Sequence, residues 1–195
     1  NREGFRRIYQ GAFDAYAVIA FPLMIGALMV GQPLMAFVAG RDFTISGTIL
    51  GIHMIAMALV FFSTLFGHVV VVLEKQKRMI FGYAVTALLA LLVYPLTIAR
   101  YGMFGAAWAT VGTEALITAL TFIMVLRTTH MAPRLTVLFK SVAAAAFMGV
   151  FLYMLRDQNL VLLLFGGTLI YFAALYLFGG IKKQTLREII SFKSL

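Results

Sequence analysis

The sequence has no cysteine and carries little charge. The absence of cysteine excludes a disulfide framework and metal sites built from thiolates. Charged residues occupy 12% of the 195 positions, whereas they make up about a quarter of an ordinary soluble domain. A chain with so few charges could not cover a folded surface in water, so we expect lipid to be its solvent.

Acidic residues are the scarcest charged class, with seven Asp and Glu against sixteen Lys and Arg and a formal net charge of +9. An excess of positive charge can indicate nucleic-acid binding, but that interpretation needs a basic patch on a folded surface. The basic residues here lie in short groups between long apolar runs. We therefore expect no nucleic-acid partner.

Catalytic motifs are also missing. The sequence holds no His-Glu-x-x-His, no Gly-x-Ser-x-Gly and no acidic cluster fit for a metal bound to pyrophosphate. We expect no enzyme, no catalytic residues, no cofactor and no metal site. One alternative stays open, an intramembrane enzyme that acts on lipid through isolated residues of several helices, because a sequence does not reveal spatial clusters.

Apolar residues dominate what is present, at 63% of the chain, and the mean hydropathy is +0.99. A helix needs about 20 apolar residues to cross a hydrocarbon core about 30 Å thick. The strands of a membrane barrel would alternate in polarity, and these runs do not. The sequence therefore predicts an all-α integral membrane protein, a bundle of six transmembrane helices. The predicted spans are residues 11–39, 44–73, 80–99, 104–126, 135–155 and 160–180.

The basic residues predict the orientation of these spans, because cytoplasmic connections carry an excess of Lys and Arg. Thirteen basic residues fall on the side that holds both chain ends, and three fall on the other side. Both termini are therefore expected in the cytoplasm, with the chain as a multi-pass protein of the cell (cytoplasmic) membrane. The three residues expected outside are Arg41, Arg100 and Arg156.

The chain divides into four predicted segments. Residues 1–10 are expected to form a cytoplasmic basic arm, and residues 181–195 a basic tail that suits a helix lying on the inner leaflet. Residues 11–128 hold four spans, and residues 129–180 hold two more. The chain begins at Asn1 with no visible signal peptide, so we expect it to be the downstream part of a longer protein.

Two prolines, Pro22 and Pro33, fall inside the first span, which is longer than a straight crossing requires. Proline removes a backbone hydrogen bond and bends a helix, so both are predicted helix-bend positions. Such bends can open a path for a substrate, although a simple kink within a bundle is the more ordinary interpretation.

A polar stripe runs along the fourth predicted span. Thr110, Glu114, Thr118 and Thr121 follow the spacing i, i+4, i+8 and i+11, which places them on one helix face. A charged residue at the centre of a span costs on the order of 2.5–3.5 kcal/mol, so Glu114 should face protein or water or be protonated. Two roles stay open for Glu114: proton or substrate coupling, and the more common one of a hydrogen-bonded packing residue.

The second predicted span has a similar stripe of His53, Met57, Thr64 and His68. His53 lies deep enough in the span to need a partner. A structural hydrogen bond is favoured there over a titrating switch. Gly47 in the same span pairs with Gly51 as a small-xxx-small motif, which permits close helix approach.

Several stretches resemble a known family when taken in order. The first span holds Phe-Pro-Leu at 21–23 and ends in Phe-Val-Ala-Gly-Arg-Asp-Phe at 37–43, and a long helix and the basic loop 73–78 follow. The most specific piece is 101–110, Tyr-Gly-Met-Phe-Gly-Ala-Ala-Trp-Ala-Thr. This order resembles the C-terminal portion of polysaccharide flippases of the Wzx type, for O-antigen or exopolysaccharide repeat units, in the multidrug/oligosaccharidyl-lipid/polysaccharide exporter superfamily.

The resemblance implies that the chain is the last six of fourteen helices, with residues 11–128 in the C-terminal lobe and residues 129–180 as the two additional helices. It implies translocation of polyprenyl-pyrophosphate-linked oligosaccharide across the cytoplasmic membrane by alternating access. The implied partners are membrane lipid, the polyprenyl-linked oligosaccharide, and the missing N-terminal lobe or a partner chain. The family's cationic cavity residues come largely from the missing helices, so few functional residues carry over.

Two other classes of function stay open beside the lipid-acting enzyme. A multidrug or small-molecule exporter of the same superfamily should depend on an ion through a residue such as Glu114. A membrane scaffold without transport activity would tolerate loss of both polar stripes.

Overall fold

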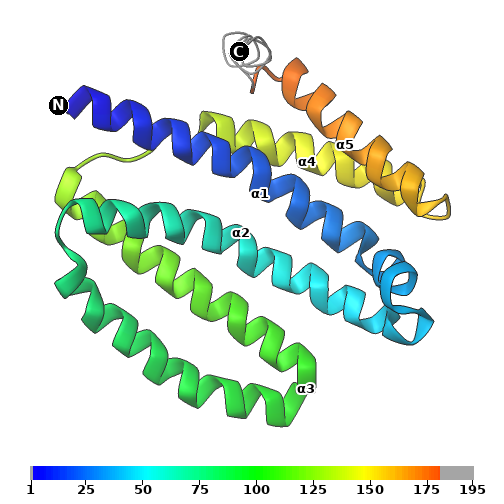
Figure 1. Ribbon diagram of the computed structural model, residues 1–195, viewed down its shortest axis with the longest axis horizontal. Helices are drawn as coiled ribbons and strands as arrows, with labels where there is room; N and C mark the ends of the chain where they lie inside the picture. Colours follow the sequence, from blue (N-terminus) through cyan, green and yellow to red (C-terminus); the bar gives the residue numbers. More distant parts are fainter. Residues whose placement is uncertain (1, 181–195) are drawn as a thin grey trace, which may run out of the picture.

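The computed structural model describes residues 2–180, and Figure 1 shows them as a bundle of long helices. No strand occurs within this part of the chain. All five of its α-helices are long and apolar enough to cross a membrane. The all-α prediction is therefore confirmed, and these helices are consistent with a multi-pass membrane protein. The predicted interfacial tail, residues 181–195, lies outside the described residues. The elements are α1 (Arg2–Ala39), the 3₁₀-helix η1 (Arg41–Phe43), α2 (Thr44–Val72), α3 (Gln76–Thr129), α4 (Thr136–Met154) and α5 (Leu160–Leu177).

The first helix, α1, begins earlier than the sequence predicts. Residues 2–10, expected as a separate basic arm, are instead its first turns. The reason is an apolar face that runs beneath the arginines, where Tyr9 and Phe13 are both buried against α2. The ring centroids of Phe13 and Phe62 lie 5.2 Å apart, so aromatic packing stabilises this part of α1.

The turn between α1 and α2 is built on glycine. Gly40 has φ 103°, a left-handed conformation that glycine adopts without strain, and η1 follows it directly. Beyond the turn the two helices approach so closely that the backbones of Gly31 and Gly47 are in contact. Gln32 Nε2 also donates to Thr48 Oγ1 at 2.9 Å. Gly47 therefore has the close-packing role that its small-xxx-small motif predicts.

The third helix, α3, is two helical arms joined at a sharp turn. Its 54 residues are interrupted at Gly102, which has the non-helical angles φ 58° and ψ −136°. Figure 1 shows the arms, residues 76–101 and 103–129, doubling back on each other. The sequence predicts two separate spans in this region, at 80–99 and 104–126. Gly105 packs directly on the backbone of Thr97.

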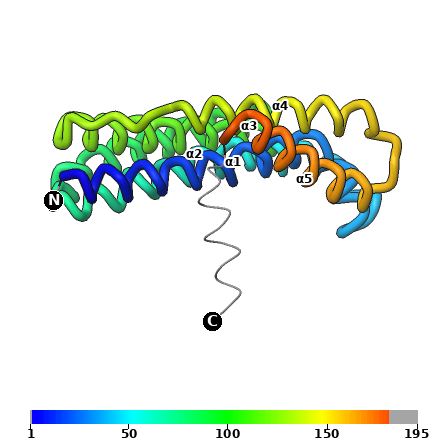
Figure 2. Tube along the Cα trace, turned by 90° about the horizontal axis from the view of Figure 1, so that it is seen from above, coloured from blue at the N-terminus to red at the C-terminus, as the bar shows by residue number. Residues whose placement is uncertain are grey.

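The connections gather at two opposite ends of the bundle (Figures 1 and 2). One end holds the N-terminus and the connections at 73–75 and 130–135. The other end holds the connection at 40–43, the turn of α3 at Gly102 and the connection at 155–159. Every group of basic residues in the described connections therefore lies at the end expected to be cytoplasmic, and the single arginines lie at the other.

Two apolar cores hold the helices together. The first joins the early turns of α1 to the later half of α2 and to Val125 of α3. The second joins α4 and α5 to Val30 of α1. Tyr171 of α5 is 1% exposed, and its hydroxyl donates to the carbonyl oxygen of Val18 at 2.7 Å. The two helices predicted as an additional pair are thus anchored on α1.

Candidate functional site

The polar stripe of α2 lies on an uncovered face of the bundle. His53, Thr64 and His68 are all exposed, and Met57 between them is 44% exposed. The Nδ1–H of His68 donates to the Thr64 carbonyl oxygen at 2.8 Å. The partner expected for His53 is not found in residues 2–180. Polar side chains within membrane spans usually face protein or a water-filled cavity.

The threonines of the second arm of α3 lie between helices. The Thr118 hydroxyl donates to the Leu59 carbonyl oxygen of α2 at 3.1 Å, and Thr121 is fully buried. Thr110 shares a 2.8 Å hydrogen bond with the hydroxyl of Tyr94, which joins the two arms of α3. Thr110, Thr118 and Thr121 are therefore packing residues, each held against neighbouring parts of the chain.

Glu114 differs from the threonines around it. Its side chain is only partly buried, and among the described residues its carboxylate has no hydrogen bond or ion pair. Its backbone carbonyl accepts a hydrogen bond from Thr118 at 2.7 Å, which is a local helix contact. The hydrogen-bonded packing role favoured from the sequence thus finds no partner in this part of the chain.

Substitution of Glu114 is expected to separate its two roles. Because no described residue holds its carboxylate, Glu114→Leu should leave the membrane abundance of this chain unchanged or raise it, by relieving part of a cost of about 2.5–3.5 kcal/mol. If the carboxylate couples a transport activity to protons or ions, Glu114→Gln should remove the pH or ion dependence of that activity. Immunoblots of membranes and export assays across pH measure the two effects.

A matched control is available one turn earlier on the same stripe. Thr110→Val removes a hydroxyl that bonds within the chain, so it should lower membrane abundance and leave the pH dependence of any coupled transport unchanged. A Glu114→Leu variant that is lost from the membrane would show that a partner depends on the carboxylate and would restore the packing role.

Both predicted helix-bend residues lie inside α1. The helix continues through Pro22 and Pro33 without interruption. Figures 1 and 2 show the last turns of α1 changing direction before η1. Pro22 and Pro33 therefore stay predicted helix-bend positions within one continuous helix.

Sequence reasoning missed two features where α1 meets the connection between α3 and α4. The first is a basic pocket lined by Arg6 of α1 and Arg134 of the connection. The second is an apolar cavity of about 430 Å³ among α1, α2, α3 and α4, lined in part by Phe13, Phe122 and Leu135. Neither carries a motif, because each one brings a residue of α1 together with residues more than a hundred positions further along the chain.

The described residues bring no three His, Asp or Glu side chains together in a group that could hold a metal ion. Comparison of the chain with protein-family models, with curated proteins and with solved structures gives no match in any of the three.

Proposed function

We propose that this chain is the C-terminal part of a membrane flippase that translocates polyprenyl-pyrophosphate-linked oligosaccharide across the cytoplasmic membrane for polysaccharide biosynthesis. In this proposal the two arms of α3 cross the membrane separately, which gives six crossings, and both termini lie in the cytoplasm. The missing N-terminal lobe, or a partner chain, covers the polar face of α2. Transport then follows from two bodies rocking about a shared site between them.

The exposed polar face of α2 is the observation that supports the proposal most. His53 and Thr64 lie well inside a 29-residue apolar helix, yet neither is covered by another described helix. Lipid is a poor environment for an imidazole, and such residues usually line a pathway or an interface between helices. A two-lobed transporter supplies both, whereas a membrane scaffold supplies an interface but no pathway.

A multidrug or small-molecule exporter is the second candidate, and Glu114 favours it. A partly exposed carboxylate without a partner in the described chain is what proton- or cation-coupled export requires. The two candidates differ in substrate rather than in architecture. Growth protection against toxic cations, set beside flipping of a polyprenyl-linked sugar, separates them.

The chain by itself is expected not to transport. Proteoliposomes that hold only these 195 residues should flip no fluorescent polyprenyl-linked sugar, because alternating access needs the second lobe. Co-expression of the missing lobe should restore flipping, measured as fluorescence lost to an impermeant quencher. Robust flipping by the purified chain alone would contradict the proposal and would favour an oligomer that is complete in itself.

This chain reconstituted together with the missing lobe also allows a test of the polar face of α2. His53→Leu should slow flipping roughly tenfold, the effect of losing about 1.4 kcal/mol of interaction. Leu169→Val on α5, where the side chain is 71% exposed, is the control and should leave the rate unchanged. Equal rates for the two variants would remove the support that the polar face gives.

A further inference from the structure

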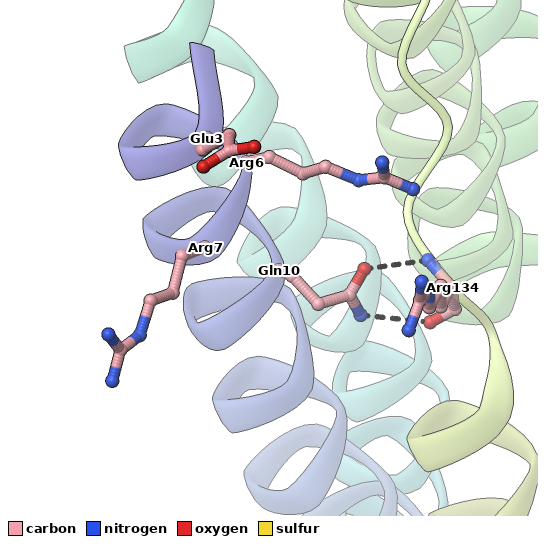
Figure 3. A pocket seen from close by; sticks show the side chains of 5 residues that line it. All are labelled: Glu3, Arg6, Arg7, Gln10 and Arg134. Carbon is pink, nitrogen blue, oxygen red and sulfur yellow. Dashed lines mark hydrogen bonds between the residues drawn. The ribbon is translucent and has the colours of Figure 1, made fainter. Parts of the chain in front are cut away.

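A basic pocket of about 300 Å³ lies where the first turns of α1 meet the connection between α3 and α4 (Figure 3). It carries three guanidinium groups against one carboxylate, and all three arginines are exposed. None of them has an ion pair among residues 2–180. The pocket is therefore strongly positive and open to an anion. Its lining residues are Glu3, Arg6, Arg7, Gln10 and Arg134.

Gln10 fixes the geometry of the pocket. Its Oε1 accepts a hydrogen bond from the Arg134 backbone N–H at 2.7 Å, and its Nε2 donates to the Arg134 carbonyl oxygen at 3.0 Å. The same Nε2 donates to Asp14 Oδ1 at 2.8 Å. These contacts hold the connection against α1, so Arg134 is placed by the fold and not left to a free loop.

Two of the arginines that line the pocket come from separate elements, Arg6 from α1 and Arg134 from the connection between α3 and α4. Figure 3 shows the Arg6 side chain crossing from α1 towards the segment that carries Arg134. In the same view Arg7 points away from both. A pair of guanidinium groups from separate elements is the usual arrangement for holding a phosphate, because each can donate two parallel hydrogen bonds.

The apolar cavity adjoins this pair along both elements. Phe13 lies one turn after Gln10 on α1, and Pro133 and Leu135 flank Arg134. The cavity is larger than the basic pocket and is lined mainly by aromatic and aliphatic side chains. A positive pocket beside an apolar cavity matches an amphiphile better than it matches a soluble anion.

We propose that this place binds an anionic phospholipid of the surrounding leaflet, with the headgroup phosphate between Arg6 and Arg134 and an acyl chain against the apolar cavity. Basic groups near a membrane surface attract anionic lipids. The bound lipid links α1 to the start of α4 and so stabilises the packing of the last two helices. This proposal concerns a structural lipid and does not depend on the transport activity.

Native mass spectrometry of the purified chain tests the proposal. Phosphatidylglycerol should bind more tightly than phosphatidylcholine and should raise the midpoint of thermal unfolding. Arg6→Gln and Arg134→Gln should each weaken phosphatidylglycerol binding about fivefold, and together about 25-fold, while phosphatidylcholine binding stays unchanged. Arg7→Gln is the matched control, since it removes the same charge one residue away and should change binding less than twofold.

Three outcomes would overturn the proposal. If Arg7→Gln weakened phosphatidylglycerol binding as much as Arg6→Gln does, the lipid would bind a diffuse basic surface and not a defined site. A similar rise of the unfolding midpoint with inorganic phosphate alone would mean a soluble-anion site. Displacement of phosphatidylglycerol by polyprenyl pyrophosphate at far lower concentration would make the place a substrate site. The chain's failure to bind phosphatidylglycerol would leave the flippase proposal unaffected.

Discussion

Gly47→Val is expected to prevent the α1–α2 hairpin from closing and to remove most folded protein from detergent extracts. A Cβ at Gly47 would overlap the backbone of Gly31 and Gln32, and a backbone cannot swing aside as a side chain can. Overpacking costs about 1–3 kcal/mol where side chains can shift, so the cost here should reach or exceed the upper value. The measurements are the yield of monodisperse protein in mild detergent and the midpoint of its thermal unfolding.

The control for this variant is the same substitution at Gly112. A Cβ there meets nothing within 4 Å, and the residue is exposed on the second arm of α3. Gly112→Val should therefore fold as well as the unchanged chain. Gly47→Ala should fall between the two, because its single methyl still meets backbone. Equal yields for Gly47→Val and Gly112→Val would contradict the close packing of α1 on α2.

The helices could be predicted from sequence because each one depends on its own residues. Long apolar runs demand helices in lipid, whatever their neighbours are. The connections predicted between residues 39 and 44 and between residues 99 and 104 contain Gly40 and Gly102, where the structure turns and glycine adopts a positive φ. The helical first turns of α1 were not predicted, because hydropathy responds to the charges of residues 2–10 and does not reveal that Tyr9, on the other side of this segment, is buried.

The environment of the polar residues could not be predicted in this way. Helical spacing shows that Thr118 and Glu114 share a face, but it does not show which neighbour lies opposite. The structure places the hydroxyl of Thr118 against Leu59 and leaves the carboxylate of Glu114 without a described partner. The contact of Gln10 with Arg134 spans 124 positions and depends on how α4 returns to α1. Such pairs follow from tertiary packing, and no local pattern encodes them.

Thiol labelling is expected to show that α3 crosses the membrane twice. A single straight helix of 54 residues would be about 80 Å long, far more than a core about 30 Å thick can hold. The turn at Gly102 divides it into two arms, each long enough for one crossing. The chain has no native cysteine, so each introduced cysteine is the only thiol to react.

Met103→Cys and Asp157→Cys should react with an impermeant maleimide in intact cells, because both positions are exposed at the end expected outside. Gln76→Cys and Ala132→Cys should react only after the membrane is permeabilised, because they lie at the end with the basic connections. In intact cells, labelling at positions 103 and 157 should be nearly complete and labelling at positions 76 and 132 nearly absent. If α3 crossed once, positions 76 and 132 would lie on opposite sides, and one of them would label in intact cells. Labelling of both from outside, with neither 103 nor 157 reacting, would instead invert the orientation that the basic residues predict.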